Sequence, residues 1–133
     1  MAICGILGDS IALGIALAHP GCDTSAKVGR STHAILAHQL PQQQHYGYVV
    51  ISAGSNNPRD PALRTQLCRI RATVKADKVV WIEPLNSALA RSMVREIAAQ
   101  HGDSTQSFTR SRDGVHPRSY SALWALVKRR LGL

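Results

Sequence analysis

Residues Ile6-Leu-Gly-Asp-Ser-Ile-Ala-Leu-Gly14 decide the interpretation of this chain, because an apolar strand pattern ends there in a Gly-Asp-Ser turn and a helical pattern follows at once. Such a turn presents Ser10 at the edge of a sheet and at the start of a helix. Backbone N–H groups face outward there with the positive end of the helix dipole, which suits an oxygen that attacks and then carries negative charge. Taken alone, the tripeptide has a second interpretation, in which Asp9 or Ser10 only caps the helix.

A second polar stretch near the other end of the chain favours the chemical interpretation. Arg112-Asp-Gly-Val-His-Pro117 places Asp113 and His116 in a tight loop ahead of another helical pattern. A serine hydroxyl is a poor nucleophile at neutral pH and needs a base such as imidazole, which in turn needs a carboxylate to fix its tautomer. Asp113 and His116 from one loop, facing Ser10 from another, would meet that need.

Length and composition indicate one globular domain. With 133 residues and 44% hydrophobic residues, the chain can bury a core, but it is too short for a second lobe, so we expect a single domain over residues 1–133. The net charge of +8 raises polyanions as partners. Aromatic residues make up only 5%, and no finger, basic-zipper or RNP-like signature occurs, so the sequence argues against nucleic-acid binding.

The cysteines and histidines give no metal signal in the sequence. Cys4, Cys22 and Cys68 are odd in number and form no C-x-x-C pair or metal-ligand spacing, which predicts free thiols in a reducing compartment. His33 and His38 share one predicted helix without a third ligand, so we expect no metal and no cofactor. The apolar run 11–18 has no Lys or Arg before it, and no stretch reaches membrane-spanning length, so a cytoplasmic protein without a membrane partner is expected.

Strand and helix patterns alternate along the chain, which predicts an α/β fold with a doubly wound parallel sheet. Short apolar or β-branched runs predict strands over 2–7, 26–29, 46–52, 78–83 and 105–108. Helical patterns occupy 10–18, 31–38, 60–74, 87–102 and 120–131, and Leu89, Met93, Val94 and Ile97 are predicted to share the buried stripe of the fourth helix. Parallel sheets bind ligands beyond the carboxyl ends of their strands, where the polar turns of this chain fall.

Four motifs in this order make the chain resemble the SGNH (GDSL-type) hydrolases. They are Gly8-Asp9-Ser10 with its helix, the glycine of Val28-Gly29, the Gly-x-Asn of Gly54-Ser55-Asn56 after a strand, and the Asp-x-x-His of Asp113 to His116. Together they cover nearly the whole chain. One departure is visible, because the family often has Asp where Asn57 stands, which raises a question about hydrogen bonding in that loop.

The resemblance implies a flavodoxin-like three-layer α/β/α fold with five parallel strands in the order 2-1-3-4-5. It implies Ser10 as the nucleophile, His116 as general base and then acid, and Asp113 as the residue that orients His116. The oxyanion would be held by the backbone N–H groups of Ser10 and Gly29 and by the side-chain amide of Asn56. Gly29 and Asn56 each keep a plainer interpretation as turn residues.

These motifs indicate a serine esterase that forms an acyl-enzyme, and they leave the substrate open. The chain is too short to build a deep lipid pocket, which favours short acyl groups, acetyl first, on a carbohydrate. Several arginines stand beside the site turns and could favour an anionic glycan, or could be ordinary solvated residues: Arg30, Arg59, Arg110, Arg112 and Arg118. A lipase or thioesterase, and a non-catalytic module that binds a polyanion, are the alternatives.

Overall fold

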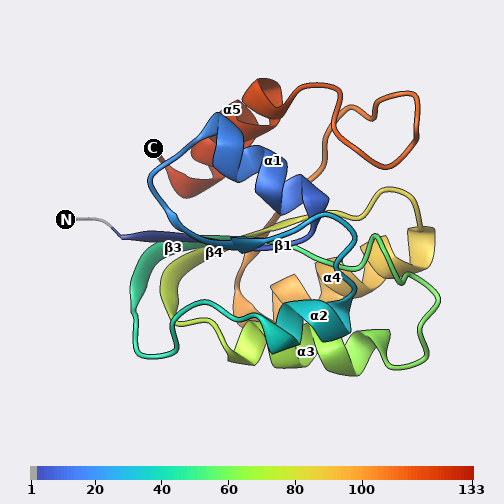
Figure 1. Ribbon diagram of the computed structural model, residues 1–133, viewed down its shortest axis with the longest axis horizontal. Coiled ribbons are helices and arrows are strands. Elements are labelled where there is room, and N and C mark those ends of the chain that lie inside the picture. Colours follow the sequence, from blue (N-terminus) through green and yellow to red (C-terminus); the bar gives the residue numbers. More distant parts are fainter. Residues whose placement is uncertain (1–2) are drawn as a thin grey trace.

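The computed structural model describes residues 3–133 as a five-stranded, all-parallel sheet between two layers of helices (Figure 1). The strands are β1 (Cys4–Gly8), β2 (Asp23–Ala26), β3 (Tyr46–Ser52), β4 (Ala76–Ile82) and β5 (Ser104–Gln106). The helices are α1 (Ser10–Ala18), α2 (Thr32–Ala37), α3 (Leu63–Ala72), α4 (Ala88–His101) and α5 (Tyr120–Leu131).

The strand order β2-β1-β3-β4-β5 confirms the predicted order 2-1-3-4-5 and the α/β fold class. Helices α1 and α5 cover one face of the sheet, and α2, α3 and α4 cover the other (Figure 1). All strands run in the same direction, so their carboxyl ends meet at one edge. The polar turns picked out from the sequence therefore follow strands at that edge.

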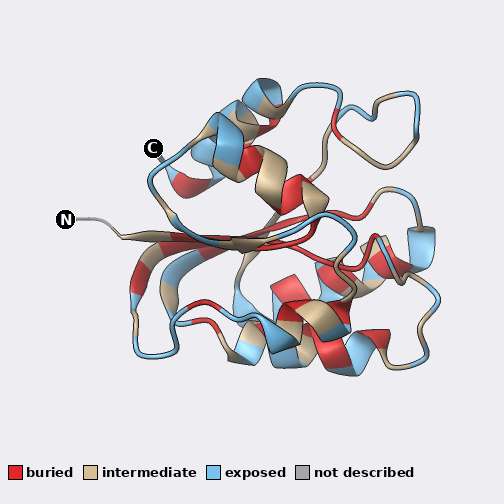
Figure 2. Cartoon of the chain, viewed as in Figure 1, coloured by how far each residue is buried: buried red, intermediate tan, exposed pale blue. Residues whose placement is uncertain are grey.

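The sheet is buried on both faces, as the apolar strand runs predicted (Figure 2). Successive strand residues point to opposite faces, so Leu7 packs under α2–α4 while its neighbour Ile6 packs under α1 and α5. Both side chains are fully buried. Two separate hydrophobic cores thus hold the sheet from its two sides and fix the positions of the strand ends.

Most predicted elements are found, and the differences have local causes. The strand 46–52 and the helix 10–18 are observed with the predicted bounds. The second strand lies three residues earlier than expected, at Asp23–Ala26, because its pairing with β1 ends where Ala26 faces Gly8. Residues 27–29 then turn, with Arg30 N–H donating to Lys27 O at 3.5 Å. Residue Ala2 of the first predicted strand lies outside the described residues.

Two predictions about the helices need correction. The third helix begins at Leu63 rather than at Pro61 with Asp60 as its cap, because Asp60 first closes a turn by accepting from Ala62 N–H at 2.8 Å. In α4, the prediction that Leu89 is buried is wrong. Its side chain is 59% exposed, and Ala90 takes the inward position ahead of Val94 and Ile97.

The cysteine prediction is also wrong, because Cys4 and Cys22 form a disulfide, while Cys68 is free. Parallel pairing of β1 with β2 places Gly5 opposite Asp23, so the residues just before them are neighbours, with Cα atoms 4.8 Å apart. The prediction of a reducing compartment rested on free thiols and loses that basis, since disulfides persist in oxidising compartments. Within residues 3–133, no helix is long and apolar enough to cross a bilayer.

Candidate active site

Ser10 follows a sharp turn between β1 and α1. The turn requires glycine at position 8, because the backbone has a positive φ there and passes close to β3. Gly8 has a φ of +146°, and a Cβ there would lie 1.9 Å from the carbonyl oxygen of Ser52 on β3. The next residue, Asp9, donates its N–H to that same oxygen at 3.2 Å. Its side chain caps α1 by accepting from Ile11 N–H at 3.1 Å. The turn is therefore fixed to the sheet on one side and to the helix on the other.

Asp9 is a buried carboxyl group next to the candidate nucleophile. Its residue is 1% exposed, and Oδ2 has no hydrogen-bond partner among residues 3–133. Burial raises the pKa of Asp9 to about 6, because ionisation in an apolar surrounding is unfavourable. Asp9 is thus the helix cap of the two candidates, Asp9 and Ser10, that the sequence offered.

Asp113 organises the loop at the other end of the site. Its Oδ1 accepts from the Ser111 hydroxyl at 2.8 Å and from the N–H groups of Val115 and His116 at 2.8 and 2.9 Å. Gly114, with a φ of +74°, makes the turn between them. The hydrogen bonds from the backbone N–H groups of His116 and Val115 hold the pKa of Asp113 well below its usual range. The carboxylate is therefore charged at any working pH.

The loop and the turn meet through one continuous chain of hydrogen bonds. His116 Nδ1 lies 2.6 Å from Asp113 Oδ2, and His116 Nε2 lies 2.8 Å from Ser10 Oγ. An ionised carboxylate accepts the Nδ1–H proton, which leaves Nε2 as the acceptor of the serine proton. The side chains of His116 and Asp113 are 40% and 50% exposed, so this hydrogen-bonded chain is open to solvent.

Tyr120 is the first residue of α5 and lies where this helix meets α1. A Cβ on Gly14 of α1 would lie 2.2 Å from the Tyr120 ring, so α5 approaches α1 closely at this point. Burial raises the pKa of Tyr120, and the carboxylates of Asp9 and Asp113 add to the effect. The phenol ring therefore packs α5 against α1, the helix that begins at Ser10.

Gly29 and Asn56 lie in two loops that the structure joins to each other. The Asn56 side-chain amide donates to Arg30 O at 2.9 Å, one residue after Gly29. Gly29 has a φ of +82° and is exposed in its turn, beside a hollow of about 310 Å³ that Lys27 and Arg30 help to line. Among the described residues, neither Gly29 nor Asn56 hydrogen-bonds to Ser10. An amide nitrogen carries two protons, so Asn56 keeps one for a further acceptor.

Asn57, which stands where the SGNH family often has Asp, is well hydrogen-bonded in its loop. Its side-chain oxygen accepts from Thr32 N–H at 3.1 Å, and its amide donates to Thr32 Oγ1 at 2.7 Å and to Asp60 Oδ2 at 3.3 Å. Thr32 Oγ1 in turn bonds the buried Gln66 side chain. The Asn57 side chain therefore ties the loop after β3 to Thr32 and Asp60.

The arginines picked out from the sequence lie at the surface without acidic partners. Arg59 and Arg112 are exposed, and Arg30 is partly exposed and donates to Ser25 Oγ at 3.0 Å. Across residues 3–133, no carboxylate oxygen lies within 4.0 Å of any of the three guanidinium groups. Their charges are consequently free to act on an approaching anion.

One group of possible metal ligands occurs in the described part of the chain, away from this site. The ligand atoms of Cys4, His19 and Cys22 lie within 4.8 Å of one another, but the two sulfur atoms are bonded to each other as the disulfide. The histidine Nε2 lies 3.1 Å from the Tyr48 hydroxyl. The expectation that the chain needs no metal stays a prediction.

The strand order and the two layers of helices confirm the three-layer α/β/α fold that the SGNH resemblance implied. In particular, the chain is similar to the C-terminal catalytic domain of peptidoglycan O-acetyltransferase A (OatA) from Streptococcus pneumoniae, solved with a methylsulfonyl adduct. The similarity has a TM-score of 0.65 at 18% sequence identity, over 98% of this chain and 94% of that one. At this identity it establishes a shared fold. No family model and no curated protein matches the sequence.

Proposed function

We propose that this protein is a serine esterase that removes a short acyl group, acetyl first, from a carbohydrate. The observation that carries the proposal is the chain of hydrogen bonds from Ser10 Oγ to His116 Nε2 at 2.8 Å and from His116 Nδ1 to Asp113 Oδ2 at 2.6 Å. This arrangement supplies a nucleophile, a base and a group that orients the base.

The reaction follows from these three groups. His116 Nε2 takes the proton of the Ser10 hydroxyl as Oγ attacks the ester carbonyl, and the imidazolium then protonates the departing sugar oxygen. The acyl group is left on Ser10. Water, deprotonated by His116, attacks the acyl-enzyme, and the proton returns to Ser10 as the carboxylic acid leaves. Asp113 keeps its charge throughout and stabilises the imidazolium.

The negative charge that develops on the carbonyl oxygen needs hydrogen-bond donors. Ser10 N–H lies in the first turn of α1, where backbone N–H groups have no partner within the helix. We assign the other donors to Gly29 N–H and to the second proton of the Asn56 amide, whose first proton is held by Arg30 O. Such a donor contributes about a hundredfold or more to turnover.

An anionic glycan fits the surroundings of the site best. The exposed loop that holds His116 leaves the nucleophile accessible to a bulky substrate. Arg30, Arg59 and Arg112 have no acidic partners in the described residues and would attract a negatively charged polymer. The fold likeness to a domain named for peptidoglycan O-acetylation supports a carbohydrate over a lipid or a thioester.

The same likeness favours a second candidate, transfer of the acyl group to a glycan hydroxyl. The chemistry would differ only in the acceptor, because the hydroxyl of a sugar would replace water in attacking the acyl-enzyme. Both reactions use Ser10, His116 and Asp113 in the same roles.

Release of p-nitrophenol from the acetyl ester tests the proposal, with Ser10→Ala as the control. The wild-type protein should turn over the ester and be labelled by a fluorophosphonate, and the variant should lose at least about 10⁴-fold in rate and all labelling. Equal rates for the two proteins would instead favour a non-catalytic module that binds a polyanion.

Two additions to this assay separate the finer possibilities. Esters of increasing chain length should react progressively more slowly if the enzyme prefers acetyl, whereas a lipase or thioesterase would show the reverse order or a preference for the thioester. Chitooligosaccharides added as acceptors should leave the yield of free acetate unchanged for an esterase. For a transferase they would gain the mass of acetyl groups.

A further inference from the structure

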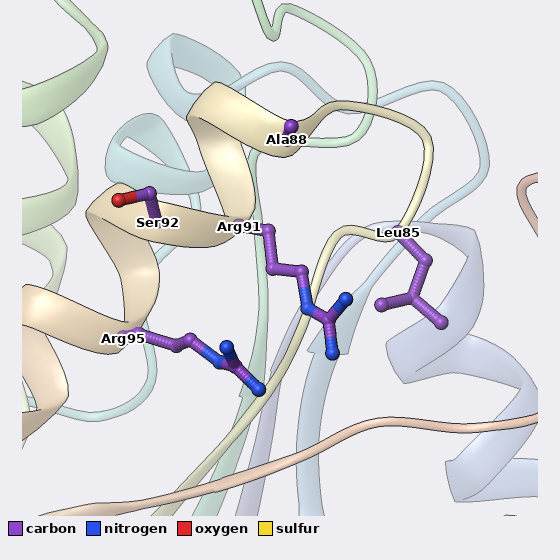
Figure 3. A pocket seen from close by; sticks show the side chains of 5 residues that line it. All are labelled: Leu85, Ala88, Arg91, Ser92 and Arg95. Atoms are coloured by element: carbon purple, nitrogen blue, oxygen red, sulfur yellow. The ribbon is translucent and has the colours of Figure 1, made fainter.

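A basic pocket lies on the side of the sheet that α4 covers, after the carboxyl end of β4. It has a volume of about 260 Å³, and Figure 3 shows its lining. The lining residues are Leu85, Ala88, Arg91, Ser92 and Arg95. None of them was singled out from the sequence, because two arginines four residues apart on a helix are usually a solvated face.

A buried carboxylate fixes both arginines of this pocket. Glu83 follows β4 and its side chain is 4% exposed, yet its Oε1 lies 2.6 Å from Arg91 Nε and 2.9 Å from Arg95 Nε. The Nε of each arginine thus pairs with Glu83, and in residues 3–133 the terminal nitrogen atoms of both arginines make no hydrogen bond and remain for another partner. Figure 3 shows the two groups side by side and directed to the same side of α4 as Leu85.

The charges of the pocket do not cancel. Two guanidinium groups face one carboxylate, and in residues 3–133 no other carboxylate oxygen lies within 4.0 Å of either arginine. One positive charge is left over, which matches a singly charged anion such as a carboxylate better than a doubly charged phosphate. The planar forks of arginine bind a carboxylate through paired hydrogen bonds.

The pocket is connected to the loop of the candidate active site. Arg110 Nη1 donates to the carbonyl oxygen of Leu85 at 3.2 Å, which links the pocket wall to the segment that leads into Asp113 and His116. Ser10 follows β1 and Glu83 follows β4, two strand positions apart at the same edge of the sheet. With strands about 4.8 Å apart, this offset is about 10 Å, within the reach of a glycan of a few sugars.

We propose that Arg91 and Arg95 form a subsite for the carboxylate of an acidic sugar in the glycan whose ester Ser10 cleaves. The role in substrate recognition rests on the proposed function, whereas binding of the carboxylate itself does not. The sugar ring would lie over Leu85 and Ala88, and the carboxylate would accept hydrogen bonds from the free guanidinium nitrogens.

Binding is tested on the full chain by titrating sodium glucuronate and following the backbone amides of Leu85, Ala88 and Ser92 by nuclear magnetic resonance. Glucuronate should shift these amides in a saturable way, and neutral glucose should not. Inorganic phosphate should bind more weakly than glucuronate. No saturable shift, or equal shifts with glucose, would overturn the proposal. Stronger binding of phosphate would overturn the assignment to a carboxylate.

Two kinds of variant locate the binding in the pocket. Arg91→Gln with Arg95→Gln should weaken glucuronate binding at least about tenfold. Because that change leaves Glu83 buried without its partners, Ser92→Glu provides a second test: it places a competing carboxylate at an exposed position of the pocket and should have a similar effect. Arg64→Gln is the control, since it removes one exposed charge that pairs with Glu96 elsewhere. A loss as large in the control would point to general charge attraction and contradict a defined subsite.

Kinetics separate this subsite from the proposed function. In Ser92→Glu, the KM for an acetylated uronic-acid oligosaccharide should rise about tenfold. The control Arg64→Gln should keep the wild-type KM and the wild-type turnover of neutral p-nitrophenyl acetate. Ser10→Ala should lose activity and still bind glucuronate. Ester cleavage with unchanged KM in Ser92→Glu would reject the subsite alone, and glucuronate binding without any cleavage would reject the esterase alone.

Discussion

The two segments that meet at Ser10 and His116 are built in opposite ways. In the turn before α1, Gly8 and Asp9 are buried, and the turn is anchored to β3. The Asp9 carboxyl group caps α1 and has no partner for its Oδ2 in the described residues. The loop from Ser111 to His116 is partly exposed, and the Asp113 carboxylate accepts four hydrogen bonds. Steric fit therefore positions the nucleophile, whereas hydrogen bonds position the base.

Because of this difference, the contributions of Asp9 and Asp113 to stability change with pH in opposite directions. The raised pKa of Asp9 means that its contribution to stability is present at low pH and is lost as pH rises through about 6. The lowered pKa of Asp113 means that its contribution is present above the usual aspartate range and is lost as pH falls below it. Four substitutions, described from the largest expected effect to the smallest, test the comparison.

Asp113→Asn should have the largest effect, and on rate rather than on folding. The amide cannot hold His116 in the tautomer that accepts the serine proton, so kcat should fall about 10⁴-fold. Hydrolysis of p-nitrophenyl acetate measures the loss, and thermal unfolding checks that the fold is kept. Ser111→Ala is the matched control, because it removes one of the four hydrogen bonds to Asp113 and should change kcat by less than about tenfold. If the control lost as much activity, the loop would be held differently from our description.

Gly8→Ala should strongly destabilise the fold. The added methyl group would lie 1.9 Å from Ser52 O, and neither β1 nor β3 can move without disturbing both cores. We expect a loss of more than about 3 kcal/mol in the free energy of unfolding, measured with urea. A variant with wild-type stability would show that the turn is not fixed by close contact with β3.

Asp9→Asn should stabilise the protein at alkaline pH. Above pH 6 the wild type buries an ionised carboxylate, and Asn is as good a helix cap without the charge. The gain should be about 1–3 kcal/mol at pH 8 and should shrink at pH 5, where the native carboxyl group is largely protonated. Urea unfolding at the two pH values measures it. A gain that is the same at both pH values would mean that the charge of Asp9 is not its cause.

Gly114→Ala should have the smallest effect, although Gly114 also has a positive φ. A Cβ there meets nothing within 4 Å, so only the backbone conformation is penalised, at about 1 kcal/mol. Its unfolding midpoint in urea should lie close to that of the wild type. A loss as large as that of Gly8→Ala would erase the contrast between a turn held by packing and a loop held by hydrogen bonds.

The alternation of local apolar and helical runs predicted the parallel sheet and the turns at its carboxyl edge, whereas the strand order was implied by the resemblance to the SGNH hydrolases. The sequence did not predict the disulfide, because the neighbourhood of Cys4 and Cys22 depends on how β1 pairs with β2 rather than on their spacing in the chain. The second strand was placed three residues late for the same reason, since its end is set by its pairing with Gly8.

In the candidate site, residue types were easier to predict than their surroundings. Ser10, Asp113 and His116 stand out as a nucleophile, a carboxylate and a base in short polar turns. The burial of Asp9, the packing of Tyr120 against α1 and the fixation of Arg91 by Glu83 depend on contacts between distant elements. No local pattern carries that information. The catalytic and oxyanion roles of the matched residues stay predictions for the experiments above to test.

The two ends of the hydrogen bond between Ser10 and His116 lie 106 residues apart in the chain, and this distance has a consequence for synthesis. All five strands precede His116 in the chain, so the part of the fold that positions Ser10 is synthesised before the imidazole that bonds it. Under the proposed function, ester hydrolysis should therefore report correct folding over the whole span from residue 10 to residue 116, and a fragment that stops before His116 should be inert.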